Sequence, residues 1–186
     1  MSEPAERLMS VDEFLQWAAA REGKFELHDG RPVAMSPERV RHAGTKSATV
    51  CALHTAIPRA GLPCRAYAGG IAVRTRRDRA FVPDVLVTSA LPPPDVVEID
   101  NPLIVIEVLS PSTMEIDLSL KLDAYLSLPS LAHYLILDPV RRVVIHHARQ
   151  DGARAVTRIY HAGPLSLDPP GLEIAVEDLF EPEGAA

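Results

Sequence analysis

Residues 103–109 read LIVIEVL, and this stretch decides the fold class. A nearly unbroken run of aliphatic and β-branched residues is typical of a strand that is buried on both faces of a sheet. Glu107 interrupts the run, and a bare carboxylate among aliphatic neighbours costs several kcal/mol unless it is paired, hydrogen-bonded or bound to a metal. Glu107 could instead face outward on an edge strand or pair with an arginine. Because Leu103, Val105 and Leu109 share its face and are apolar, the pattern favours a functional carboxylate.

A second carboxylate, Asp84, lies in the run FVPDVLV at residues 81–87. Taken alone, the Pro-Asp pair is weak evidence, since it commonly marks a turn. Together with Glu107 it is stronger, because two carboxylates on neighbouring strands are rigid oxygen ligands that leave positions for water and phosphate. The two acids therefore predict a site for a hard divalent cation, Mg²⁺ or Mn²⁺.

A cation that could serve such a site is Lys121, one of three lysines in a chain with sixteen arginines. It lies close to the helical stripe formed by Leu118 and Tyr125. A lysine at the margin of an apolar face often extends its ammonium group to water. Beside two buried carboxylates it would instead neutralise them and present a positive charge to an attacking water or a phosphoryl oxygen.

Helices and strands alternate along the rest of the chain. A capping box at residues 10–13 predicts a helix that runs to about residue 20. Asp29-Gly30 predicts a tight hairpin between strands at 24–28 and 31–35. Ser36-Pro37 reads as the N-cap and first residue of a helix over 38–57 that stops before Pro58.

The pattern in the rest of the sequence predicts a sheet, with a helix between two of its strands along the chain. We expect a Pro-rich loop at 88–102, a helix at 114–126 and a short terminal helix or turn at 176–180. The expected strands are 64–68, 71–74, 83–87, 103–109, 133–138, 143–148 and 155–160. This order indicates an α/β or α+β protein with a mixed sheet.

Length and composition are those of one globular domain, residues 1–186 with a core at about 11–180. No apolar run is long enough to span a bilayer and no secretory signal is recognised, so we expect a cytoplasmic protein with no membrane contact. Two cysteines are too few for a disulfide framework or a zinc site. The net charge of −6 argues against binding nucleic acid through bulk charge.

A local basic patch precedes Phe81 and is the candidate nucleic-acid contact. A solvated hairpin tip explains the same residues equally well. The patch consists of Arg74, Arg76, Arg77 and Arg79.

Several segments in their order along the chain resemble the Uma family of restriction-endonuclease-like proteins, within the PD-(D/E)XK nuclease superfamily. The resemblance covers about residues 11–180, and IEVLSPST is its most specific part. The segments are FELHDGRPVAMSP (25–37), His42, VPDVLVTS (82–89), LIVIEVLSPST (103–113), Asp117, Lys121, Tyr125 and HYLILDP (133–139).

The resemblance implies a restriction-endonuclease-like fold, a central mixed sheet flanked by helices, with Asp84 and Glu107 as metal ligands on adjacent antiparallel strands. The superfamily often places its lysine two residues after the second acid, where this chain has Leu109. The family pattern takes the lysine from the next helix, which matches Lys121. It also implies that Glu26 completes the acidic cluster.

Three accessory positions follow from the same resemblance. His42 matches a family position, although it could be a solvated helix residue beside Lys46, and Glu26 could likewise be an exposed strand residue. Asp117 could act only as the i,i+4 partner of Lys121. The accessory residues are His42, Asp117 and Tyr125.

The hypothesis that best fits the sequence is a Mg²⁺-dependent DNA endonuclease, a hydrolase of phosphodiester bonds. Cleavage of both strands usually needs two active sites, so we expect a homodimer. Two other interpretations stay open. The chain could be a catalytically silent module for binding or assembly. It could also be a hydrolase of small phosphorylated molecules, and the presence or absence of basic surface around the site would distinguish a DNA nuclease from such an enzyme.

Overall fold

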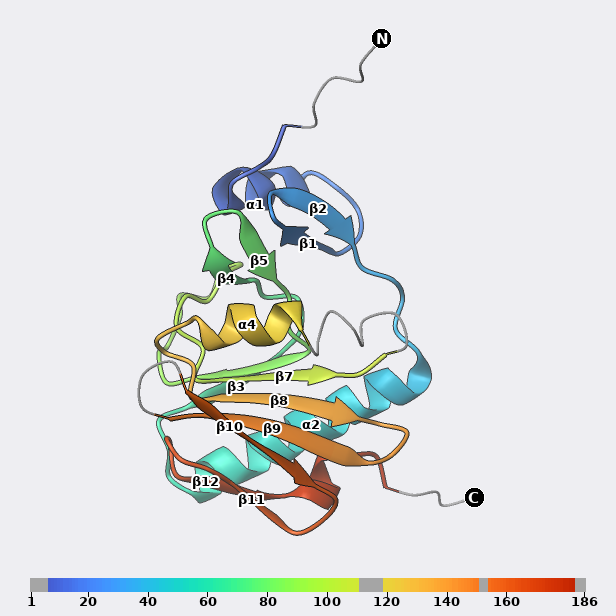
Figure 1. The fold of residues 1–186 in the computed structure, drawn as a ribbon, viewed down its shortest axis with the longest axis vertical. Helices are drawn as coiled ribbons and strands as arrows, with labels where there is room; N and C mark the ends of the chain where they lie inside the picture. The colour runs from blue at the N-terminus through green and yellow to red at the C-terminus, as the bar shows by residue number, and fades with distance from the viewer. Residues whose placement is uncertain (1–6, 111–118, 151–153, 183–186) are drawn as a thin grey trace.

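The computed structural model describes residues 7–110, 119–150 and 154–182. Its main sheet has six strands in the order β10-β9-β8-β7-β6-β3 (Figure 1). Strands β7 and β8 are parallel and the other neighbours are antiparallel, so the sheet is mixed as expected. The strands are β3 (Arg65–Ala68), β6 (Val85–Thr88), β7 (Ile104–Val108), β8 (His133–Asp138), β9 (Val143–Arg149) and β10 (Ala155–Tyr160).

The apolar run that Glu107 interrupts forms β7, near the centre of the main sheet. All five residues of this strand are buried. Its alternate side chains face two different helices. Ile104 and Ile106 pack on the side of α2 (Val40–Arg59), whereas Val105 packs on the side of α4 (Leu120–Leu126). The sheet is thus flanked by helices on both faces (Figure 1).

A smaller sheet, in the order β2-β1-β5-β4, lies beside the main one. Helix α1 (Val11–Ala19) begins at the expected capping box and packs against this sheet. Asp29 and Gly30 both have positive φ, as a tight hairpin between β1 and β2 requires. The strands are β1 (Phe25–His28), β2 (Arg31–Ala34), β4 (Val73–Arg76) and β5 (Arg79–Phe81).

The predicted limits of α2 are wrong at both ends. Arg39, not Ser36, is its N-cap, because residues 35–39 stay extended between β2 and the helix. The helix also continues through Pro58 to Arg59. Pro58 lies in the last turn, where the lost N–H removes a single helical hydrogen bond.

Three strands were not expected. The prediction ended a strand at Arg74, but β4 continues to Arg76 and β5 follows it. The hairpin β11 (Pro164–Leu167) and β12 (Leu172–Ala175) lies before a 3₁₀ helix, η1 (Val176–Leu179), where a short helix or turn was predicted. The predicted helix over 114–126 is confirmed from Leu120 onward, and its earlier part lies outside the described residues. Among the described helices, none has both the length and the apolar character needed to cross a bilayer.

Candidate active site

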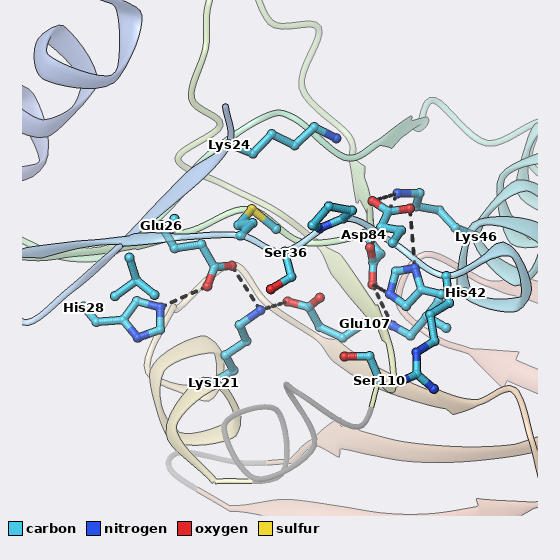
Figure 2. Close-up of a pocket in the computed structure, with 17 residues that line it drawn as sticks. Lys24, Glu26, His28, Ser36, His42, Lys46, Asp84, Glu107, Ser110 and Lys121 are labelled. Carbon is cyan, nitrogen blue, oxygen red and sulfur yellow. Dashed lines mark hydrogen bonds and ion pairs between the residues drawn. The ribbon is translucent and has the colours of Figure 1, made fainter. Parts of the chain in front are cut away.

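A pocket of about 840 Å³ lies where the two sheets, α2 and α4 meet (Figure 2). Strand β1 contributes Glu26 and His28, and the extended segment 35–39 forms one wall. Asp84 precedes β6, Glu107 lies on β7 and Lys121 lies on α4. The structure therefore brings the predicted Glu26, Asp84, Glu107 and Lys121 to one pocket, although they come from four separate segments of the chain.

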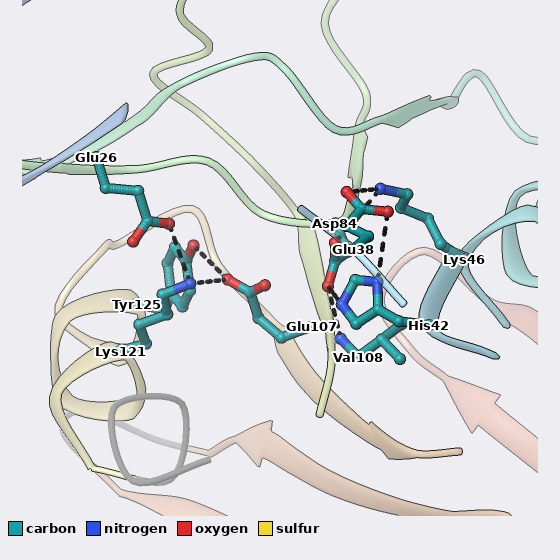
Figure 3. Close-up of polar contacts among 9 residues, drawn as sticks. All are labelled: Glu26, Glu38, His42, Lys46, Asp84, Glu107, Val108, Lys121 and Tyr125. Atoms are coloured by element: carbon teal, nitrogen blue, oxygen red, sulfur yellow. Dashed lines mark hydrogen bonds and ion pairs between the residues drawn. The ribbon is translucent and has the colours of Figure 1, made fainter. Parts of the chain in front are cut away.

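One half of the pocket is built around the Lys121 ammonium group. Its Nζ lies 2.9 Å from Glu107 Oε1 and 3.1 Å from Glu26 Oε1 (Figure 3). The Tyr125 hydroxyl donates a hydrogen bond of 3.0 Å to the same Glu107 oxygen. Glu26 also accepts a hydrogen bond of 3.0 Å from the Val82 backbone N–H. One buried lysine thus bridges carboxylates from the two sheets.

The other half is built around Asp84. Its Oδ2 accepts a hydrogen bond of 2.8 Å from the backbone N–H of Val108, the residue after Glu107, which fixes the start of β6 against the end of β7. His42 Nε2 lies 3.1 Å from the same oxygen, and Lys46 Nζ lies 3.7 Å from Oδ1. Glu38 forms an ion pair with Lys46 and approaches His42 Nδ1 at 3.5 Å. Figure 3 shows the Glu107 carboxylate between this half and Lys121.

Charge decides the protonation states of two of these groups. Burial alone would raise the pKa of Glu26, but the hydrogen bond with His28 and the charge of Lys121 outweigh burial and lower that pKa. Burial would likewise lower the pKa of His42, and the contact with Asp84 reverses the effect and raises it. Glu26 is therefore held as a carboxylate, and His42 is biased toward the imidazolium form.

The Asp84 half has the donors that a divalent cation needs. The ligand atoms of Glu38, His42 and Asp84 all lie within 4.8 Å of one another. His42 Nδ1 is buried and has no hydrogen-bond partner in the described part of the chain. Carboxylate oxygens suit Mg²⁺ and Mn²⁺, and an imidazole nitrogen that has lost its proton is a ligand that Mn²⁺ also accepts. The residues present thus fit a hard divalent ion.

The arginine patch lies elsewhere. Its four residues sit on or between β4 and β5, and none of them lines the pocket. Arg74 is hydrogen-bonded to Glu98 and Asp12, and the buried Arg79 forms an ion pair with Asp29. A contact between this hairpin and nucleic acid stays a prediction. Of the accessory residues, Tyr125 and His42 lie in the site, and Asp117 lies outside the described residues.

Sequence reasoning missed several side chains that the structure adds to the pocket, among them His28, Glu38 and Lys46. Each had a spacing signal. His28 follows Glu26 by two residues and so shares its strand face, and its Nε2 lies 2.9 Å from Glu26 Oε2. Glu38 and Lys46 stand four residues before and after His42. The spacing became informative only once Asp84 was placed beside them.

A mixed sheet flanked by helices, with buried acids beside a helix-borne lysine, defines the restriction-endonuclease-like class of α/β proteins. The family Uma2, described as "Putative restriction endonuclease", matches residues 11–179, and the chain belongs to this family. The chain is also 27% identical over 179 residues to the uncharacterized protein slr1290 of Synechocystis sp., covering 92% of this chain and 91% of that protein.

A solved structure has the same fold. It is the crystal structure of a protein from Anabaena variabilis described as "a putative nuclease belonging to DUF820", with a TM-score of 0.72. The sequences are 20% identical, and the match covers 92% of this chain and 97% of that one. At this identity the likeness supports the arrangement of sheet and helices and does not assign an activity.

Proposed function

We propose that the protein is a divalent-metal-dependent nuclease that hydrolyses phosphodiester bonds of DNA in this pocket. The observation that carries the proposal is the gathering of three buried carboxylates at the base of the pocket. Glu26 and Glu107 share the single Lys121 ammonium group, and Asp84 lies at the adjoining end of the same strands. Burial of several carboxylates so close together is costly, and a bound divalent cation would offset that cost.

The chemistry of each side chain suggests its role in the proposed reaction. Asp84 and Glu107 would hold the ion, with Glu38 and His42 next to Asp84 and Glu26 behind Lys121. A bound Mg²⁺ or Mn²⁺ polarises a phosphate and lowers the pKa of its water. Lys121 presents its positive charge to the phosphoryl oxygens as negative charge develops on them. Tyr125, through its hydrogen bond to Oε1, fixes the orientation of Glu107.

Cleavage of plasmid and single-stranded DNA by the purified protein tests the proposal. With Mg²⁺ or Mn²⁺ we expect nicking or cutting that chelator abolishes. Asp84→Ala, Glu107→Ala and Lys121→Ala should each remove activity, and double substitutions should cost little more, because residues that act as a unit are not additive. The assay belongs at low ionic strength, because the chain has a net charge of −6.

Two results would contradict the proposal. Activity that survives Glu107→Ala in an identical preparation would come from a contaminating nuclease. Complete inactivity of the wild type on every DNA form with both metals would favour a module that binds or assembles without catalysis.

A further inference from the structure

The basic side chains of the pocket fall into two groups. Lys121 and Lys46 contact carboxylates directly. Lys24 and Arg39 also line the pocket, but they are exposed and have no acidic partner among the described residues. Figure 2 shows the Lys24 side chain extending over the pocket. Two uncommitted positive charges therefore stand at the rim of an otherwise acidic site.

Three of the four hairpin arginines differ in this respect. Arg74 and Arg79 are already paired with acids, and Arg76 lies 3.6 Å from Asp78. A cation that already forms an ion pair contributes less free energy to phosphate binding, because the existing ion pair must first be broken. The exposed Arg77 side chain has no acidic partner among the described residues, but it does not line the pocket. Unpaired positive charge next to the reacting groups is therefore found at Lys24 and Arg39.

The reacting groups are recessed. Glu26, Asp84, Glu107 and Lys121 are between 4% and 8% exposed, so the scissile phosphate has to enter the pocket to meet them. Next to them, segment 33–37 supplies apolar surface, including Val33, which is 40% exposed although apolar. An unpaired strand can place a phosphate in the recess and a splayed base or sugar on this wall. A duplex keeps its bases stacked inside and is held through many phosphates at once.

We propose that the pocket takes an unpaired nucleic-acid strand, and that Lys24 and Arg39 bind the phosphates next to the scissile one. The inference rests on the proposed nuclease function and names its substrate class. It also predicts how strongly salt weakens binding. Each phosphate neutralised on a single strand contributes about −0.7 to the slope of log K against log salt. Two cations give about −1.4, which is about a 7-fold loss of affinity between about 50 and 200 mM salt.

Fluorescence anisotropy with a labelled single strand of about 10 nucleotides tests the proposal. The titrations contain chelator, which prevents cleavage, so that they measure binding alone. The wild type should bind the single strand more tightly than the matching duplex, with the slope given above. Lys24→Ala with Arg39→Ala should abolish most of the salt dependence. Lys24→Arg with Arg39→Lys should retain it, because the charges are kept.

The matched control is Arg59→Ala with Arg154→Ala, which removes the same charge from two exposed positions outside the pocket and the hairpin and should leave affinity unchanged. The proposal is overturned by tighter binding of duplex or by no binding to any nucleic acid. It is also overturned if the hairpin variant, Arg76→Ala with Arg77→Ala, loses the salt dependence while the Lys24 and Arg39 variant keeps it. An inactive wild type that binds single strands through Lys24 and Arg39 would refute the nuclease function and retain the binding site.

Discussion

Replacing Lys121 with Met should destabilise the metal-free protein far more than replacing Glu107 with Gln. Lys121 is buried and bridges Glu107 and Glu26 at 2.9 and 3.1 Å. Its removal leaves two carboxylates facing each other, and the described residues place no other cation between them. In the Glu107→Gln variant, the amide oxygen of the new side chain would still accept the hydrogen bonds of Tyr125 and Lys121. The lysine would also keep its ion pair with Glu26.

The magnitudes follow from this difference in charge. Breaking a buried ion pair from one side costs about 3–5 kcal/mol. For a chain of 186 residues, that lowers Tm by about 6–20 °C. Glu107→Gln removes one of two negative charges that share one positive charge, so repulsion falls as one ionic hydrogen bond weakens. We expect its stability to lie within about 1 kcal/mol of the wild type, or above it.

Thermal and urea unfolding in the presence of chelator measure both variants. Lys24→Met is the matched control, because it removes an exposed lysine of the same pocket and should change stability by less than about 0.5 kcal/mol. Equal destabilisation by Lys121→Met and Glu107→Gln would refute the reasoning. It would identify an ordinary buried ion pair with no excess negative charge for a metal to relieve.

Three further measurements test other parts of the structure. Mg²⁺ or Mn²⁺ should raise the Tm of the wild type, since an ion that binds only the native state stabilises it, and Asp84→Asn should lose that rise in a thermal-shift assay. Burial, followed by the nearby His133, lowers the pKa of His146 to about 4. The neutral form of His146 therefore contributes stability that is fully present above the ordinary pKa of about 6.5 and is lost as the pH falls toward 4. The free energy of unfolding measured in urea should change less with pH over this range in His146→Gln than in the wild type. Ser10→Ala should cost about 0.5–2 kcal/mol in urea unfolding through loss of the capping box, whereas the exposed Ser47→Ala should cost less.

The acids and the lysine of the site could be found in the sequence because each violates a local pattern. Glu107 interrupts a buried strand, and Asp84 interrupts the apolar run 81–87 directly before the neighbouring strand β6. A buried charge is costly wherever it occurs, so its presence in an apolar run is informative without any knowledge of the fold. The same reasoning located the centre of the main sheet, since the run around Glu107 forms β7.

What the sequence could not supply depends on contacts between distant segments. Strand β5 was missed because Arg79 looks like a solvated residue, yet in the structure it is buried and paired with Asp29, fifty positions away. The role of Glu38 and Lys46 as neighbours of Asp84 depends on how α2 docks at the end of β6. Spacing along one element predicts a shared face, and only the tertiary structure shows what that face meets.

The distribution of lysine adds an argument that no single contact gives. The chain has three lysines and sixteen arginines, and all three lysines line this pocket, where Arg39 is the one arginine among its described lining residues. A guanidinium group is a planar fork with five donors, whereas an ammonium group is compact and fits between two carboxylates that approach from different sheets. Lys121 occupies such a position between Glu26 and Glu107. In a chain that otherwise uses arginine for most of its basic positions, Lys121 thus stands where the two carboxylates require a compact charge, a constraint that general surface charge does not explain.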